Sequence, residues 1–187
     1  MLQIRDIRES DYKPLYSQMK RDFLHELAPY FAIKRNLENN IYNGFFLTED
    51  TDKDIGYAII TAPENLKYSL INYFAISSEH RSKGYGSEFL KIILSRYFER
   101  ILVLEVDAPA KNAAPDDKDV RRIKFYERAG FRVIPTKKAK IFGVDMLIMA
   151  NIADKSDEQF SAREIMHALY LPALGSKQWL RFVDVID

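Results

Sequence analysis

Residues 80–87 carry residue types that could bind a phosphate group. They read His-Arg-Ser-Lys-Gly-Tyr-Gly-Ser and lie between a strand-like run and a helix-like run. Glycines in such a turn let backbone N–H groups face outward, and the N-terminus of a helix adds roughly half a positive charge. The pattern predicts a cradle for a pyrophosphate, although glycines that serve only the geometry of a turn would give the same letters.

Two familiar phosphate-binding loops are excluded by particular residues. Gly84 is followed by Tyr85 and not by the Lys-Ser/Thr pair of a P-loop. Phe89 stands where the third glycine of a dinucleotide-binding motif belongs. The segment therefore favours a phosphate site of another kind.

Glu105 is the best candidate for a proton-transferring group. It interrupts an otherwise apolar run, 101–106, where an acid is costly unless it is paired or used. A carboxylate there could accept a proton from a substrate, or it could serve the structure by bonding to backbone. Asp107 lies two residues on, so it points to the same face of a strand and could share the site.

The composition excludes several other kinds of chemistry. The 187 residues contain no cysteine, which rules out thiol nucleophiles, disulfides and thiolate metal ligands. His25, His80 and His167 lack metal-ligand spacing, so no metal is implied. Because 28 basic and 27 acidic residues leave a net charge of +1, nucleic acid is not an expected partner.

Signals for export or membrane insertion are missing from the sequence. Charges fall within the first eight residues, and no run approaches the roughly 18 apolar residues of a membrane helix. We expect a cytoplasmic protein with no membrane partner.

These residues need a scaffold, and the apolar periodicity predicts an α+β domain. Strands are expected over residues 2–7, 42–48, 54–61, 68–77, 101–106, 131–134 and 141–150. Helices are expected over residues 11–25, 29–40, 84–98 and 120–130. This order predicts one mixed α/β three-layer sandwich that spans residues 1–150.

Residues 151–187 lie outside that plan. Residues 157–170 look helical, and Leu171-Pro172 with Gly175 should end the helix. We expect a C-terminal helical extension packed on the same domain or on the partner of a homodimer. Its apolar residues could serve either arrangement: Trp179, Leu180, Phe182 and Val183.

Two motifs in this order resemble those of the GCN5-related N-acetyltransferase (GNAT) superfamily. Arg81-x-x-Gly84-x-Gly86 is similar to the coenzyme A loop of that family, and Phe-Tyr-Glu-Arg-Ala-Gly-Phe at 125–131 is similar to its Tyr-x-x-x-Gly-Phe motif. The likeness covers about residues 2–150. It implies the acyl-CoA N-acyltransferase fold, a twisted and mostly antiparallel sheet flanked by helices. It also implies an enzyme that transfers an acetyl group from acetyl-CoA to a primary amine by direct attack.

The resemblance further implies which residues act. The strand before the loop would give backbone hydrogen bonds to the pantetheine arm through Phe74, Ala75 and Ile76. The pyrophosphate would be held by the loop residues Arg81, Ser82, Lys83, Gly84, Tyr85, Gly86 and Ser87, two of them charged. Tyr126 matches the general acid of the family, and Glu105 resembles a glutamate that sometimes serves as its base.

Some questions stay open in the sequence. Asp119 stands where the family often has an asparagine, seven residues before the tyrosine, and the loop 111–119 looks lengthened. The acceptor, a small molecule or an exposed protein amine, is not identified. Asp22 and Glu26 could attract a cationic amine, and an aromatic wall could be formed by Tyr30, Phe31, Tyr42, Tyr73 and Phe74. The alternative to an enzyme is a non-catalytic acyl-CoA-binding regulatory module.

Overall fold

The computed structural model of this chain describes residues 2–23, 27–49, 53–152 and 160–187. His25 and Glu26, both named in the sequence analysis, lie outside the described residues. No helix within these ranges is long and apolar enough to cross a membrane.

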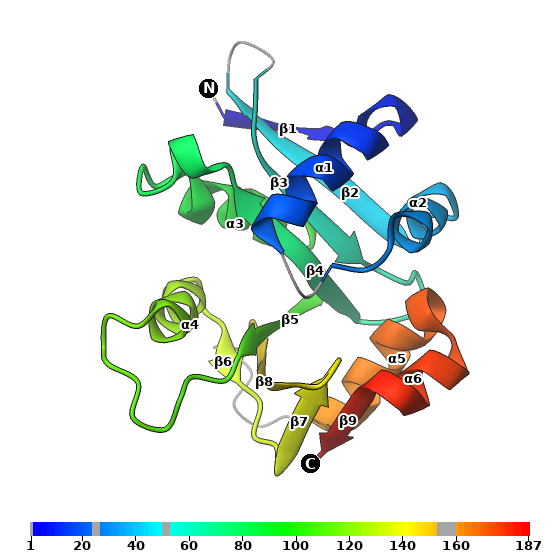
Figure 1. The fold of residues 1–187 in the computed structure, drawn as a ribbon, viewed down its shortest axis with the longest axis vertical. Coiled ribbons are helices and arrows are strands. Elements are labelled where there is room, and N and C mark those ends of the chain that lie inside the picture. Colours follow the sequence, from blue (N-terminus) through cyan, green and yellow to red (C-terminus); the bar gives the residue numbers. More distant parts are fainter. Residues whose placement is uncertain (1, 24–26, 50–52, 153–159) are drawn as a thin grey trace.

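A single mixed sheet crosses the described part of the molecule (Figure 1). Its order is β1-β2-β3-β4-β5-β8-β7-β9, with β6 paired to β8. The strands are β1 (Leu2–Asp6), β2 (Tyr42–Glu49), β3 (Lys53–Thr61), β4 (Tyr68–Ile76), β5 (Ile101–Asp107), β6 (Arg132–Val133), β7 (Lys138–Ile141), β8 (Val144–Ala150) and β9 (Val183–Ile186). Every described pair is antiparallel except β4 and β5, which are parallel. The predicted α+β class and mostly antiparallel sheet are confirmed.

Helices cover both faces of the sheet, which gives three layers (Figure 1). They are α1 (Tyr12–Asp22), α2 (Tyr30–Glu38), α3 (Tyr85–Arg96), α4 (Lys118–Arg128), α5 (Ala162–Leu174) and α6 (Ser176–Phe182), with short 3-10 turns η1 (Glu9–Asp11) and η2 (Ser78–His80). α3 and α4 pack on one face in a cluster with Phe89 and Tyr126. On the opposite face, α1 and α2 bury Leu15 and Ile33, and α5 buries Leu169.

The side chains of β5 alternate between these two faces. Leu102 and Leu104 belong to the cluster beneath α3 and α4, whereas Ile101 and Val103 belong to the cluster beneath α5. Because successive residues of a strand point to opposite faces, Glu105 faces the α5 side.

The strand predicted over 141–150 was wrong in one respect, because it is a hairpin. β7 ends at Ile141, and β8 begins at Val144, its partner in the pairing. The two residues between them have positive φ angles, 50° at Phe142 and 86° at Gly143. Such angles are those of a type I′ turn, which favours glycine at its second position.

The predicted helix end at Leu171-Pro172 with Gly175 was wrong for Leu171-Pro172 and right for Gly175. α5 continues through Pro172 to Leu174 and ends at Gly175, whose φ is 77°. Proline in the last turn removes only one helical hydrogen bond, and the apolar face continues to the buried Ala173. Residues 153–159, which begin before the predicted start at 157, lie outside the described ranges.

The end of the chain folds back on the same chain. β9 pairs with β7, and Trp179 and Val183 are buried in the cluster that α5 forms with the sheet. Leu180 points away and is 78% exposed. The amphipathic pattern of α6 therefore serves the core of this chain on one side and faces outward on the other.

Candidate functional site

β4 and β5 separate at the centre of the sheet. Their parallel ladder ends at the pair Ile71 and Leu104, so residues 73–76 pair with β3 alone among the described strands. The register between β3 and β4 shifts next to Asn72, whose Oδ1 accepts hydrogen bonds from the N–H and the hydroxyl of Thr61 at 2.9 and 2.7 Å. A bulge of this kind increases local twist, which favours the splay.

The splay leaves one backbone edge of β4 open to a ligand. Phe74, Ala75 and Ile76, the residues expected to hold the pantetheine arm, lie on this edge. The ring of Phe74 turns toward α3 and stacks on Phe89 at 5.2 Å between centroids. The strand is thus anchored by its side chains, and on this edge the carbonyl of Ile76 is already bonded to Arg81.

The glycine loop, residues 81–87, follows β4 and leads into the start of α3. Ser82 and Gly84 have positive φ angles, 62° and 85°, and Gly84 caps the helix without any side-chain hydrogen bond. A Cβ at Gly84 would meet nothing within 4 Å, so the space in front of the helix N-terminus is open. Free N–H groups and the helix dipole make such an end suited to an anion.

The other loop residues divide between exposure and packing. Lys83 and Ser87 are exposed, and Tyr85 donates its hydroxyl to Oε1 of Glu49 at 2.9 Å. A Cβ at Gly86 would lie 3.6 Å from the ring of Phe125, an ordinary van der Waals contact, so the packing of α3 against α4 does not require a glycine there.

Arg81 is engaged with the protein. Its Nη2 lies 2.9 Å from Oδ1 of Asp22, and its Nε donates to the carbonyl of Ile76 at 2.9 Å. The sequence suggested that Arg81 faces phosphate and that Asp22 attracts a cationic amine, but in this arrangement the two side chains neutralise each other.

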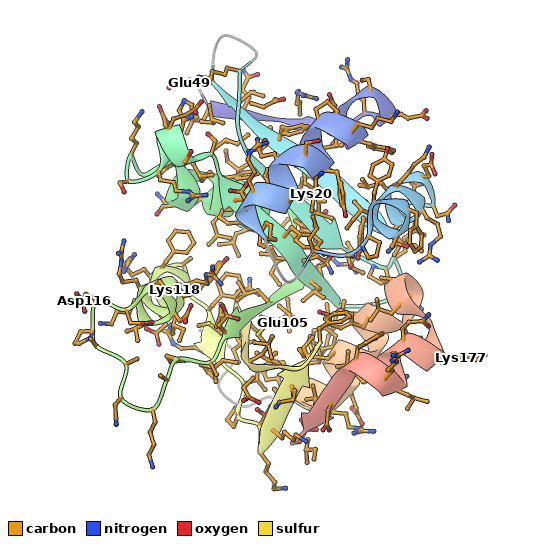
Figure 2. The ribbon with its side chains drawn as sticks, viewed as in Figure 1. Lys20, Glu49, Glu105, Asp116, Lys118 and Lys177 are labelled. Atoms are coloured by element: carbon orange, nitrogen blue, oxygen red, sulfur yellow. The ribbon has the colours of Figure 1, made fainter. Side chains whose placement is uncertain are left out.

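Glu105 is the first residue of β5 beyond the β4–β5 ladder. Its Oε2 accepts a hydrogen bond from the hydroxyl of Tyr170 on α5, with 2.9 Å between the oxygens; Glu105 is labelled on β5 in Figure 2. Asp107 instead faces Arg122 of α4, with 3.5 Å between Oδ2 and Nη1. The two acids are therefore held by different elements, and only Glu105 lies directly after the splay.

Tyr126 lies on the opposite face of β5 from Glu105. It is 8% exposed, in one cluster with Leu104 and Val106, and its ring centroid is 5.7 Å from that of Phe131. Burial raises the pKa of Tyr126 to about 12, against the opposing effect of Arg122. Within the described chain its hydroxyl has no hydrogen-bond partner, so it is a protonated donor available to a ligand.

The motif around Tyr126 also has a local structural cause. Gly130 has a φ of 90° just after α4 ends, and Phe131 is fully buried. The glycine allows the chain to reverse, and the phenylalanine anchors it to the core.

The five aromatic residues suggested as a wall do not form one. Tyr42 and Tyr73 are buried on the face of α1 and α2, whereas Phe74 faces α3. Tyr30 packs on Tyr16 of α1, and Phe31 is 70% exposed.

Sequence reasoning did not point to three residues that shape the site: Tyr170, Asn72 and Thr61. Asn72 stands out as an amide in an apolar strand, which is a signal for a bulge or a bond across the sheet. Tyr170 gives no such signal, because it reads as an ordinary core residue of an apolar helix.

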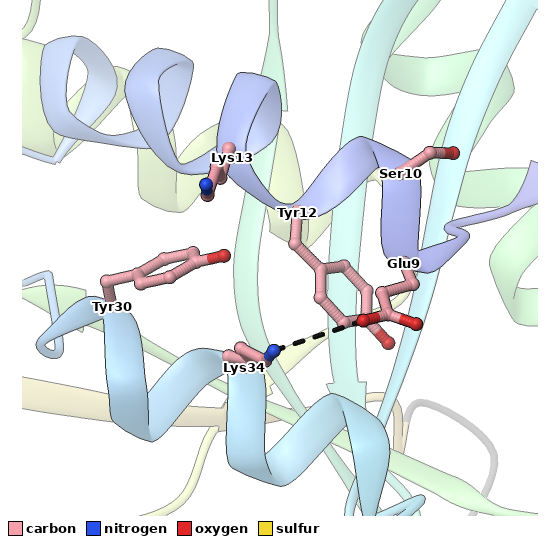
Figure 3. Close-up of a pocket in the computed structure, with 6 residues that line it drawn as sticks. All are labelled: Glu9, Ser10, Tyr12, Lys13, Tyr30 and Lys34. Atoms are coloured by element: carbon pink, nitrogen blue, oxygen red, sulfur yellow. Dashed lines mark ion pairs between the residues drawn. The ribbon is translucent and has the colours of Figure 1, made fainter.

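A separate cavity of about 460 Å³ lies between the start of α1 and α2 (Figure 3). It is lined by Glu9, Ser10, Tyr12, Lys13, Tyr30 and Lys34. Lys34 reaches Glu38 at 3.1 Å and Glu9 at 4.0 Å. None of the residues that border the splay or the glycine loop takes part in it.

Comparison with solved structures gives the same fold in other proteins. A protein described as a GNAT-family acetyltransferase from Bacteroides thetaiotaomicron is 20% identical, with a TM-score of 0.72, over 93% of this chain and 99% of that one. The ribosomal-protein-S18-alanine N-acetyltransferase of Escherichia coli is 20% identical, with a TM-score of 0.61, over 86% and 100%. The spermidine N-acetyltransferase of Vibrio cholerae, solved with CoA and spermine, is 14% identical, with a TM-score of 0.63, over 80% and 94%.

Comparison by sequence gives fewer matches than comparison by structure. No curated protein matches the chain significantly. The model of the acetyltransferase (GNAT) family matches residues 2–131. Because this match covers more than half of the chain and both motifs, the chain belongs to the acetyltransferase (GNAT) family.

Proposed function

We propose that this protein is an N-acetyltransferase that transfers the acetyl group of acetyl-CoA directly to a primary amine. The proposal rests on one arrangement at the centre of the sheet. The β4–β5 ladder ends at Leu104, directly before Glu105, and Glu105 lies on one face of β5 while the protonated Tyr126 lies on the other. An acetyl donor in this splay would meet a proton acceptor and a proton donor from opposite sides of the sheet.

The residues of the open edge fit coenzyme A. The edge of β4 beyond the β5 ladder, at Phe74, Ala75 and Ile76, suits the amide groups of pantetheine, although Arg81 occupies the Ile76 carbonyl, and the uncapped α3 N-terminus behind Gly84 suits its pyrophosphate. Lys83, exposed beside the loop, adds a charged donor for phosphate. Acetyl-CoA would supply an acetyl group already activated as a thioester.

Glu105 and Tyr126 would manage the protons. An amine near neutral pH is mostly protonated, so it must lose a proton before it can attack a carbonyl carbon, and Glu105 would accept that proton directly or through water. Tyr126 would donate a hydrogen bond, and finally a proton, to the departing sulfur. Its pKa of about 12 keeps the phenol protonated at neutral pH.

The acceptor is proposed as a class only, a small molecule or an exposed protein amine. Two proteins of the same fold are named for such acceptors, spermidine and the alanine of a ribosomal protein. Both are primary amines, and both are therefore the first acceptors to try.

The test is an acetyl-CoA turnover screen over polyamines, amino acids, aminoglycosides and peptides with free N-termini. We expect turnover with at least one amine, and its loss in Glu105→Gln and Tyr126→Phe with nearly unchanged CoA affinity. Asp107→Asn is the matched control, because it removes a neighbouring acid that pairs with Arg122, and it should keep most activity. Saturating acetyl-CoA at about 100 times its dissociation constant should add roughly 2.7 kcal/mol of stability.

Two outcomes would contradict the proposal in different ways. CoA binding without turnover of any amine, together with a biological effect that survives Glu105→Gln and Tyr126→Phe, would identify a non-catalytic module. The absence of any stabilisation by acetyl-CoA or CoA would remove the ligand itself from the proposal.

A further inference from the structure

Helix α5 brings a tyrosine from the end of the chain to the candidate base. The hydroxyl of Tyr170 donates to Oε2 of Glu105 at 2.9 Å, across 65 positions of sequence. Tyr170 lies outside residues 2–131, the part of the chain that the family model matches. The contact therefore belongs to the C-terminal segment of this protein and not to the matched family core.

The helix that carries Tyr170 is fixed in place by α2. The carbonyl of Ala173, in the last turn of α5, accepts hydrogen bonds from Arg35 at 2.9 Å and from Asn36 at 3.4 Å. Carbonyls in the last turn of a helix lack partners within the helix, so these donors satisfy one of them. Because Asn36 and Ala173 are both buried, Tyr170 is held at Glu105 by a packed interface.

The tyrosine is a constant donor to the carboxylate. Tyr170 is 8% exposed, and burial followed by the charge of Glu105 raises its pKa well above the ordinary value. The phenol therefore stays protonated at neutral pH. A hydrogen bond to the charged form of a carboxyl group lowers its pKa relative to the same site without the donor.

Other titratable groups also lie on this face. Tyr42 of β2 and Tyr73 of β4 lie close enough to raise the pKa of Tyr170 further. The charge of Arg35 on α2 in turn lowers the pKa of Tyr42. On the same strand, Asp107 is paired with Arg122. Within the part of the chain that is described, Tyr170 of α5 donates a side-chain hydrogen bond to Glu105.

We propose that Tyr170 is a positioning residue for Glu105: its hydroxyl orients the carboxylate and holds it ionised for proton transfer, a role that rests on the function proposed above. The C-terminal segment thereby completes the acid–base apparatus of the transferase. The amine would meet a base that already has its orientation and its charge.

The test uses Tyr170→Phe in the full chain, with Tyr97→Phe as the matched control. Tyr97 is also 8% exposed and hydrogen-bonded, but to Asn43 and not to the site. The first readout is the titration of the Glu105 side-chain carboxyl by carbon-13 NMR, with the signal assigned by its loss in Glu105→Gln. We expect Tyr170→Phe to move this titration up by about one pH unit, tenfold in the ionisation constant, and Tyr97→Phe to leave it unchanged.

The second readout is the pH profile of kcat/KM, with spermidine and an N-terminal alanine peptide as probes. Tyr170→Phe should shift the acidic limb upward by the same amount, while its CoA affinity stays that of the wild type. An unshifted Glu105 titration in Tyr170→Phe would overturn the proposal whatever the activity. A shifted titration in a protein that acetylates no amine would instead overturn the proposed function and leave the link between the two residues standing.

Discussion

Arg81 and Asp22 form an ion pair that ties the glycine loop to the end of α1, with 2.9 Å between Nη2 and Oδ1. The other oxygen of Asp22 accepts the hydroxyl of Tyr57 on β3 at 2.9 Å. Arg81 also binds the carbonyl of Ile76, the last residue of β4. The largely buried carboxylate of Asp22 thus joins the loop to α1 and to β3 of the sheet.

Asp22→Ala should therefore weaken coenzyme A binding from a distance. The substitution leaves the Tyr57 hydroxyl and the Arg81 guanidinium without their acceptor, which costs about 1–3 kcal/mol of unfolding free energy. The loop loses its tether, so CoA affinity by calorimetry should fall several-fold. The control is Asp6→Ala, because Asp6 is 76% exposed and 3.8 Å from Arg96, and such surface pairs contribute little.

Arg81→Ala distinguishes a guanidinium that holds the loop from one that contacts phosphate directly. If Arg81 acts by holding the loop, Asp22→Ala and Arg81→Ala should lower CoA affinity by similar factors. A loss in Arg81→Ala alone would mean that the guanidinium leaves Asp22 and contacts phosphate directly, contrary to the tether argument.

Gly84→Ala should remove coenzyme A binding more than it removes stability. Gly84 has a φ of 85°, where a side chain costs about 1–2 kcal/mol, but a Cβ would meet nothing within 4 Å. The methyl group would stand in the open space before α3 and obstruct an anion there. We expect a moderate fall in thermal stability and a loss of CoA affinity of at least about tenfold, roughly 1.4 kcal/mol.

Gly143→Ala is the matched control for this change. Gly143 has a φ of 86° and equally open surroundings, but it lies in the β7–β8 turn. It should lose similar stability and keep its CoA affinity. Equal CoA affinities in the two variants would show that the space before α3 is not the anion site.

Much of the fold could be predicted because its signals are local. The alternation of β5, the glycines near Gly84 and the end of α4 just before Gly130 each reflect a rule that acts within a few residues. The hairpin at Phe142 and Gly143 was missed although its signal was also local, because one apolar run covers both strands.

The partners within the site could not be predicted, because they join distant segments. Glu105 stands out as an acid in an apolar strand, but the sequence does not say which residue will bind it. Arg81 and Asp22 are 59 positions apart, and Glu105 and Tyr170 are 65 apart. Side chains that meet only when helices dock on a sheet leave no periodic pattern.

Tyr126→Phe should change the alkaline stability of the protein as well as its turnover. The phenol ionises at its ordinary pKa of 10.0 in the unfolded chain and at about 12 in the folded one. The contribution of the protonated phenol to the free energy of unfolding is therefore fully present below pH 10 and is lost as the pH rises toward 12. At pH 11 the free energy of unfolding is lower by about 1.4 kcal/mol, the equivalent of one pKa unit, and this loss is absent in Tyr126→Phe.

Urea unfolding at pH 8 and at pH 11 measures this difference. The wild type should lose more stability between the two values than Tyr126→Phe, and at pH 8 the variant should be nearly as stable, because its missing hydroxyl has no partner within the described residues. Phe131→Leu, which removes neighbouring core volume without a titratable group, should lower stability equally at both values. Equal losses in the wild type and Tyr126→Phe would mean that burial does not hold the phenol protonated, and the assignment of Tyr126 as the proton donor would lose its physical basis.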